Sequence, residues 1–475
     1  MPLHLTLSFK APYRYLGGFV QHSADRHGVP VCVQQSADRI DVWIKMDDPE
    51  ALHAFADRLE AELPHSIFMG NVHAEAVETV PDACERFASD PYPIGLCPQC
   101  LHALFDPNAS AYRDDTWICD HYTDAPRAIH PRVTLTPHAA PDMTLLLCDT
   151  QRISELFSVT PNEQRALFSI EKPALKLTVA DAQLREELGS GYAWVRAPYS
   201  SQTALAALEA REAGIAYLFY RRDAALEMSV VQETLLMIRS RDFDTIEPIE
   251  KEKDRCEWRF VSAANETGRA RALGAYMSHS HGIRFYLKDG EMTRSLFHFA
   301  PFVLGGLLAR METDEVRRKL LRNFSAAYPH RYERLQRIDE SDFFGALGVV
   351  LGLEQDGFEP LSDLALGFRG NGGLKIDAFL DDKGFDFVPF MGSVMSYVLA
   401  GAESVHIAYS IFEALADVTI TTLEQLKQRF EIDQYVLLGD LFENSIMTSR
   451  ILSKFQMADY VFPRTVALDY VPEKS

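Results

Sequence analysis

The sequence has few cysteines, no long apolar run and no excess of positive charge. Its 475 residues include seven cysteines, an odd number with uneven spacing, which is a poor basis for a disulfide framework. No run reaches the roughly 18 uncharged apolar residues that a membrane-spanning helix needs, and the first residues lack the basic and apolar segments of a secretory signal. We therefore expect a cytoplasmic protein with no membrane partner.

The charge of the chain is strongly acidic. Asp and Glu outnumber Lys and Arg by 68 to 47, a formal net charge of -21. The electrostatic field of a negative net charge repels the phosphate backbone of nucleic acids unless a local basic patch outweighs it. We therefore expect no nucleic-acid partner. Apolar residues make up 47% of the chain, which is enough for several domains with ordinary cores.

The first part of the chain, residues 1–82, alternates period-2 apolar segments with helical ones. Segments such as LHLTLSF, VPVCVQ and RIDVWIK are typical of strands, and PEALHAFADRLEAEL is typical of a helix capped by Asp48. The order strand, helix, strand, strand, helix, strand predicts a split βαβ unit. In such a unit two helices lie on one face of a four-stranded antiparallel sheet.

The rest of the chain divides by composition into three regions. Residues 83–138 are rich in proline and hold three of the cysteines, which predicts a module organised by a metal. Residues 139–245 alternate apolar strands with helices, as α/β domains do, and a Thr-Pro pair at Thr160 marks a helix start. The charged stretch DFDTIEPIEKEKDRCE predicts a boundary near 245, and residues 246–475 mix strands with long amphipathic helices. The predicted fold class is multidomain, α+β and α/β.

A zinc-ribbon pattern is the strongest chemical motif. Its three cysteines are a CxxC knuckle and a third sulfur 18 residues farther on: Cys97, Cys100 and Cys119. A full ribbon would have a fourth sulfur at Tyr122, so the set is completed by His121, by Cys84 or by nothing. The alternative is three ordinary buried thiols.

Any zinc here should be structural, because nothing nearby suggests an open coordination position with a general base. The other cysteines are expected to be buried thiols: Cys32, Cys84, Cys148 and Cys256.

The stretch CPQCLHALFDPNASAYRDDTWICDHYTDAPRAI resembles the first zinc ribbon of HypF, the carbamoyltransferase of hydrogenase maturation. The spacing of the knuckles, the Phe-Asp-Pro after the first and the Pro-Arg after the second carry this resemblance. SVTPNEQRALFSIEKPALKLTV and WVRAPYSSQTALAAL resemble parts of that family's YrdC-like domain. ALGAYMSHSHGIRFYLKDGEMTRSLFHFAP, VHIAYSIFEALADV and VLLGDLFENSIMTSRIL resemble parts of its actin-like domain.

The resemblance implies four parts in a chain shorter than the family's. They are an acylphosphatase-like domain (1–82), a zinc-ribbon remnant (83–138), a partial YrdC-like domain (139–245) and a partial actin-like domain (246–475).

The resemblance also implies binding roles that the residues support only weakly. Arg14 and Gln35 stand where an acylphosphatase binds its anion, although an exposed surface arginine is the more ordinary reading of Arg14. Gly439, Asp440 and Asn444 stand in the nucleotide-binding turn of the actin-like domain, where Asp440 replaces a glycine. The YrdC-like segment ends LFYRRD, without the family's Ser and Asn. ATP is therefore not an expected cofactor.

Two further motifs have competing interpretations. His279 and His281 are predicted to alternate along a strand and share one face, as a metal-binding pair or as solvated surface groups. The Gly-rich stretch FRGNGGLKID at 368–377 is predicted to be a tight turn rather than a phosphate loop.

Three functions remain open. The first is a non-catalytic accessory or scaffold of nickel-iron hydrogenase maturation that docks a protein partner, either a maturation factor or a hydrogenase subunit. The second is an active carbamoyltransferase that uses carbamoyl phosphate and ATP. The third is a zinc-stabilised interaction module unrelated to hydrogenase. Partial domains leave apolar edges uncovered, so we expect either that the two partial domains pack against each other or that a homodimer covers these edges.

Overall fold

The structure is a computed structural model of the whole chain. It describes residues 2–36, 38–46, 48–81, 84–90, 94–119, 121–122, 130–241, 254–299, 306–338, 342–381, 384–432, 434–454 and 459–470. The chain divides into two compact units, Met1–Val230 with Ser240–Thr245 and Val231–Arg239 with Ile246–Ser475. Within the described ranges, no helix is both long and apolar enough to cross a membrane.

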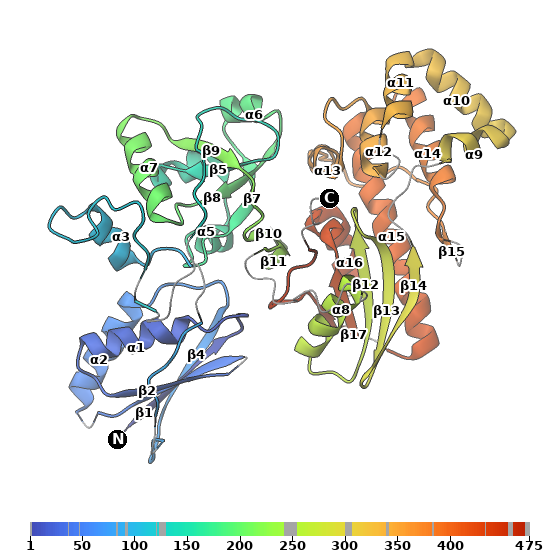
Figure 1. Ribbon diagram of the computed structural model, residues 1–475. Helices are drawn as coiled ribbons and strands as arrows, with labels where there is room; N and C mark the ends of the chain where they lie inside the picture. Colours follow the sequence, from blue (N-terminus) through green and yellow to red (C-terminus); the bar gives the residue numbers. More distant parts are fainter. Residues whose placement is uncertain are drawn as a thin grey trace. The chain divides into compact units, whose positions relative to one another are not determined.

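The first unit begins with a four-stranded antiparallel sheet (Figure 1). Its elements follow in the order β1 (Leu3–Phe9), α1 (Leu16–Arg26), β2 (Val31–Gln35), β3 (Arg39–Ile44), α2 (Pro49–Glu62) and β4 (Met69–Ala76). The strands are arranged β2-β3-β1-β4, with antiparallel pairing throughout. The predicted split βαβ unit is therefore confirmed.

The alternation of apolar residues gives this sheet one face that can be buried. Leu5 is paired with Val42 and Leu7 with Ile40, so these side chains share the face on which α1 and α2 lie (Figure 1). The Asp48 carboxylate accepts a hydrogen bond from the backbone N–H of Glu50 at 3.0 Å, which confirms the predicted cap of α2.

A disulfide bond between Cys32 and Cys84 corrects the prediction that both are free thiols. Their Cα atoms are 5.5 Å apart although 52 positions separate them in sequence. Cys32 lies in β2 and is buried, whereas Cys84 is exposed. Because the two cysteines lie far apart in sequence, their spacing did not predict the disulfide bond. Cys148 and Cys256 are buried free thiols, as predicted.

The rest of the first unit contains a helix with the CxxC motif and a mixed sheet. The helix is α3 (Pro98–Phe105). The elements that follow are β5 (Met143–Leu147), η1 (Thr150–Arg152), α4 (Ile153–Leu156), β6 (Phe157–Ser158), α5 (Pro161–Leu167), β7 (Ala174–Val179), α6 (Ala182–Leu188), β8 (Tyr192–Arg196), α7 (Ser201–Glu212), β9 (Tyr217–Arg221) and β10 (Glu227–Val231). The strand order is β10-β7-β8-β5-β9, with β6 beside β7.

Local capping defines the helix starts in this sheet region. Thr160 and Glu163 form a capping box at the start of α5, with Pro161 in its first turn, so the predicted Thr-Pro helix start is confirmed. Strand β5 pairs with β8, and β10 with β7, in parallel orientation, whereas β7 runs antiparallel to β8.

The second unit has a sheet and a layer of helices. Its strands are β11 (Thr234–Arg239), β12 (Arg271–Ser278), β13 (Gly282–Asp289), β14 (Met292–Phe299), β15 (Leu380–Asp381), β16 (Gly384–Phe385), β17 (Gln434–Leu438) and β18 (Asp459–Val461). Its helices are α8 (Arg255–Glu266), α9 (Leu307–Thr313), α10 (Glu315–Ala327), α11 (Pro329–Arg337), α12 (Phe343–Leu351), α13 (Phe358–Leu366), α14 (Phe387–Leu399), α15 (Ser404–Phe430), η2 (Asp440–Glu443) and α16 (Ser445–Lys454).

The five-stranded sheet of this unit is ordered β14-β13-β12-β17-β18. A buried cluster that includes Phe260 and Ala264 of α8, Tyr276 of β12 and Val436 of β17 packs the helix against it. The long helix α15 agrees with the long amphipathic helices predicted for this region.

The histidines of the SHSH motif lie in a turn, so the predicted shared strand face is wrong. β12 ends at Ser278 and β13 begins at Gly282, which places His279 and His281 in the connection between the strands. Gly282 has a φ of 82°, a left-handed conformation that glycine adopts without strain. The Gly-rich stretch at 368–377 is not followed by a helix in the described residues up to 381.

Candidate metal centre

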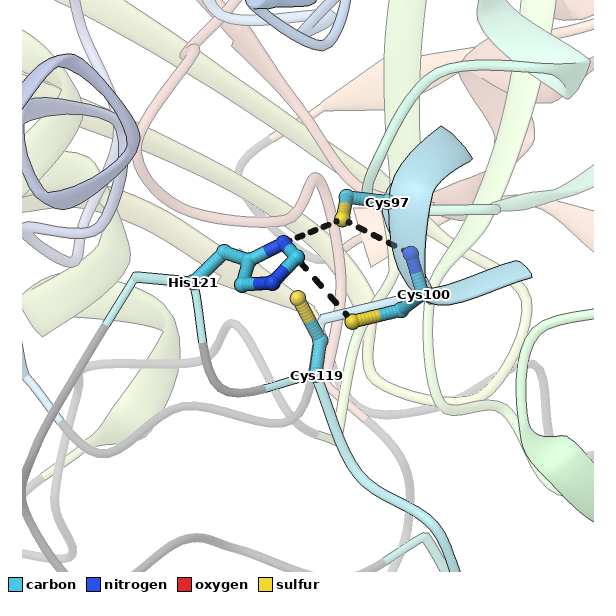
Figure 2. Close-up of side chains that lie close together, drawn as sticks. All are labelled: Cys97, Cys100, Cys119 and His121. Atoms are coloured by element: carbon cyan, nitrogen blue, oxygen red, sulfur yellow. Dashed lines mark hydrogen bonds between the residues drawn. The ribbon is translucent and has the colours of Figure 1, made fainter. Parts of the chain in front are cut away.

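Four side chains of the first unit point toward one another: Cys97, Cys100, Cys119 and His121 (Figure 2). Their ligand atoms all lie within 4.8 Å of one another. The Nδ1 atom of His121 is 3.1 Å from the sulfur of Cys97 and 3.8 Å from the sulfur of Cys100. The structure therefore brings together the residues that the sequence predicted, with His121 as the fourth member. Cys84 is excluded as a ligand because its sulfur is bonded to Cys32.

The start of α3 positions the first two sulfurs. Cys97 is the N-cap residue, and its sulfur accepts a hydrogen bond from the backbone N–H of Cys100 at 3.4 Å. Hydrogen bonds from Cys100 and Cys119 lower the pKa of Cys97 to about 4, whereas the pKa of Cys119 is raised well above its usual range by the same neighbours and by burial. The sulfur of Cys97 therefore ionises more readily than the sulfur of Cys119. A cation would allow all three sulfurs to ionise.

The donor set fits a structural zinc ion. Three sulfurs and one imidazole nitrogen are a common tetrahedral set, in which ligand atoms bound at about 2.0–2.3 Å lie about 3.5–3.8 Å apart. The Cys100 to His121 distance of 3.8 Å agrees with this spacing. All three cysteines are buried, and four protein donors leave no open position for a reacting water. Zinc bound here would hold the chain segments together rather than catalyse a reaction.

Helix α1 packs against the segment that carries the last two ligands. The ring of His22 stacks on the ring of His121 with centroids 4.2 Å apart, and Phe19 stacks on Tyr122. A Cβ atom on Gly18 would overlap the carbonyl oxygen of Tyr122, so only glycine allows this approach. Tyr122, at the position of the family's fourth sulfur, is thus buried against α1.

The two residues proposed for anion binding have different surroundings. Arg14 lies between β1 and α1, and both its backbone N–H and its guanidinium bind the carboxylate of Asp90, at 2.8 and 3.1 Å. Gln35 is the last residue of β2, and its buried Oε1 has no partner among the described residues. The guanidinium of Arg14 is therefore already paired with a carboxylate of the chain itself.

The predicted nucleotide-binding turn is packed inside the second unit. Asp440 is buried and pairs with Arg239 at 2.8 Å and with His279 at 2.7 Å. Burial disfavours the charge of Asp440, yet His279 and Arg239 hold its pKa far below the usual range. Burial likewise opposes the charge of His279, but Asp440 raises its pKa above the usual value. Gly439 has a φ of 96°, and a Cβ atom there would overlap Met277.

Asn444 acts as a helix cap. Its side-chain oxygen accepts hydrogen bonds from the backbone N–H groups of Ile446 and Met447, and its amide donates to Ser362 at 2.9 Å. The second histidine of the turn, His281, pairs with the buried Asp469 at 3.0 Å. Each histidine of the motif therefore has its own carboxylate, and within the described residues the two do not share a metal-binding group.

Sequence reasoning missed a set of buried cations in the mixed sheet. Arg196, in β8, donates a hydrogen bond to the carbonyl of Lys172 at 2.6 Å, and its guanidinium lies 3.6 Å from the ring centroid of Tyr199. Arg222 pairs with the buried Glu227, with a second bond at 2.8 Å. Burial lowers the pKa of Lys172 to about 8. The available signal was an arginine at the end of an otherwise apolar strand, YAWVR.

No model of a protein family matches this sequence. Protein HydE of Wolinella succinogenes is 28% identical over 222 residues, which are 42% of this chain and 40% of that protein. The chain thus matches less than half the length of this curated relative.

Two solved structures are similar over nearly the whole chain. The full-length HypF in its phosphate- and nucleotide-bound form superposes with a TM-score of 0.61 at 12% identity, covering 98% of this chain and 96% of that one. The T.kodakarensis HypF superposes with a TM-score of 0.64 at 13% identity, with the same coverage. The protein described here therefore has a HypF-like fold.

Proposed function

We propose that this chain is a HypF-related protein of nickel-iron hydrogenase maturation that acts as an accessory or scaffold and transfers no carbamoyl group. The HypF-like fold and the match to HydE support the relation to this family. The observation that carries the scaffold role is that Arg14, Arg196 and Arg222 lie against carboxylates of the chain itself.

The buried cations of the mixed sheet illustrate this pairing. Adenylyl transfer needs free cations and oriented donors around the phosphates. Arg222 is held by Glu227, and Arg196 lies 3.6 Å from the carboxylate of Asp223. Releasing Arg222 for a ligand would remove the guanidinium that pairs with Glu227, a carboxylate that is 1% exposed. Both arginines thus stabilise the sheet.

Two cavities lined by described residues of the second unit are also acidic. One has a volume of about 630 Å³, and its charged lining residues are Lys375, Asp386, Glu413 and Asp417. The other, of about 930 Å³, shares Glu413 and Asp417 and adds Glu424, Arg450 and Lys454. Carboxylates outnumber cations in each, which disfavours a nucleotide triphosphate. Arg450 already binds Asp417 and Glu413, each at 2.6 Å.

Binding of the substrates tests this proposal directly. Isothermal titration of the zinc-loaded protein with ATP, with carbamoyl phosphate and with both should give no measurable heat, while an active HypF gives binding heat in the same buffer. Micromolar binding of either compound would overturn the scaffold role. It would favour the alternative, an active carbamoyltransferase, since one structural neighbour is described as phosphate- and nucleotide-bound.

The protein partner would be a maturation factor or a hydrogenase subunit. Co-purification of the tagged chain from cells that assemble a nickel-iron hydrogenase should retain one of these. If neither binds, and no hydrogenase gene lies near this one, the interaction-module alternative gains support.

A further inference from the structure

Strand β4 is an exposed edge of the N-terminal sheet. It is bonded to β1 on one side, and within the described residues no strand lies on its other side. From Gly70 to Ala76 every residue is exposed, and Val72 has 58% of its surface accessible. Edge strands of monomeric proteins are usually protected by lysine, proline or a bulge that twists them away. The eight residues of β4, MGNVHAEA, contain neither lysine nor proline, and the register shift in the pairing of β1 with β4 lies between Leu7 and Phe9, at the Met69 end of the strand.

The backbone groups on the outer side of β4 are bonded to no strand among the described residues. The N–H of Val77 donates to the carbonyl of Pro2 on the β1 side. Because successive residues of a strand direct their N–H and C=O groups to opposite sides, His73 and Glu75 also face β1, and Val72, Ala74 and Ala76 face outward. These three outward residues each present one donor and one acceptor to a neighbouring strand.

The sequence of β4 is complementary to itself in an antiparallel arrangement. A register with Ala74 opposite Ala74 of a second copy sets Val72 against Ala76, and each such pair exchanges two backbone hydrogen bonds. The same register sets His73 opposite Glu75, in the closely spaced type of pair whose side chains meet. The apolar residues then share one face of the joined sheet. On the other face, the imidazole of His73 from each copy lies opposite the carboxylate of Glu75 from the other copy, so the pair occurs twice.

We propose that two copies of this chain associate through β4, forming one continuous antiparallel sheet across a two-fold axis at Ala74. Complementarity of the side chains selects this occupant, because the imidazole of His73 lies opposite the carboxylate of Glu75 in this register. Glu75 uses one carboxylate oxygen for His4 at 3.2 Å, and its side chain is 55% exposed, so the other oxygen is free for His73 of the second copy. A strand-edge contact belongs to the small interface class, so we expect dissociation at about 1–100 μM.

A concentration series tests the association. Sedimentation velocity of the full chain should show a monomer that converts to a dimer over this range. Ala74→Lys places two ammonium groups opposite each other on the axis and should weaken the dimer by at least about tenfold. Gln34→Lys adds the same charge to β2, the other edge of the sheet, and should leave the dimer intact.

A cross-link tests the register. Residues of a hydrogen-bonded antiparallel pair have Cα atoms about 5.5 Å apart, which suits a disulfide bond. Ala74→Cys should therefore give a dimer on a non-reducing gel after mild oxidation, whereas Asn71→Cys, which has no copy of itself opposite, should not. A chain that stays monomeric at about 100 μM would overturn the proposal. So would a dimer that Ala74→Lys leaves unchanged, or equal cross-linking of both cysteine variants.

Discussion

The zinc ligands make the clearest prediction at the scale of single residues. We expect the purified chain to hold one zinc ion, and His121→Ala or Cys97→Ser to lower its zinc affinity by at least about a hundredfold. Loss of an outer-shell partner alone costs about 10–100-fold, and each of these residues contributes a ligand atom. Competition with a chromogenic chelator measures the affinity. Cys148→Ser, a buried thiol outside the cluster, is the control and should retain the metal.

The pair of His279 and Asp440 should make stability depend on pH. The depressed pKa of Asp440 contributes stability above its ordinary value of 3.8, and this is lost as the pH falls. The raised pKa of His279 contributes stability below its ordinary value of 6.5, and this is lost as the pH rises through the raised value. The pair therefore stabilises most between these two values.

His279→Gln should accordingly lower the free energy of unfolding more at pH 6 than at pH 9, as measured by urea titration. At pH 6 we expect a loss of about 1.5–3 kcal/mol, the cost of losing one of the two charged partners of a buried carboxylate, because Arg239 still pairs with Asp440. His53→Gln replaces an exposed histidine of α2 and should have little effect at either pH. Equal losses at the two pH values would contradict the ion pair.

At the scale of elements, a helix, strand or turn could be predicted from the sequence when the residues that determine it lie close together along the chain. The βαββαβ unit was predicted because alternation and caps such as Asp48 are local. The turn that contains His279 was not predicted, because Asp440, which accepts the backbone N–H of His279, lies 161 positions away in sequence. The bond between Cys32 and Cys84 was missed for the same reason. The metal cluster was predicted because three of its ligands follow a known spacing.

Helix α1 should tolerate no side chain at Gly18. Replacing a glycine inside a helix with alanine ordinarily stabilises the folded protein by about 0.5–1 kcal/mol. Here the added methyl group would overlap the carbonyl of Tyr122, so Gly18→Ala should instead destabilise the first unit by about 1–3 kcal/mol. The midpoint of urea unfolding measures the change. Gly191→Ala, where a Cβ atom has open space, is the matched control.

The disulfide bond should stabilise the N-terminal sheet. Closing a loop of 52 residues restricts the unfolded chain, which corresponds to about 4 kcal/mol in the chain-entropy model. Cys84→Ser should lower the free energy of unfolding by up to this amount under oxidising conditions. Under reducing conditions the variant and the parent protein should agree. A difference that persists in reductant would assign the effect to packing of Cys84 instead.

At the scale of the whole molecule, the chemistry divides between the two units. The zinc ligands and the disulfide bond belong to the first, whereas the buried histidine and aspartate pairs belong to the second. The first unit thus contains the four candidate metal ligands and a disulfide bond, and the second contains buried ion pairs.

Hydrogen exchange followed by mass spectrometry can test this division. Removing zinc with a chelator should speed exchange in α3 and in α1, because His22 and Gly18 contact the metal-binding segment. Asp440→Asn should speed exchange at the end of β12 and in η2, since the carboxylate accepts the backbone N–H of His279 at 3.0 Å. Each treatment should leave the peptides of the other unit unchanged. If zinc removal also loosened β12, the metal would act on the second unit as well, and a scaffold with two separately stabilised parts would no longer describe the chain.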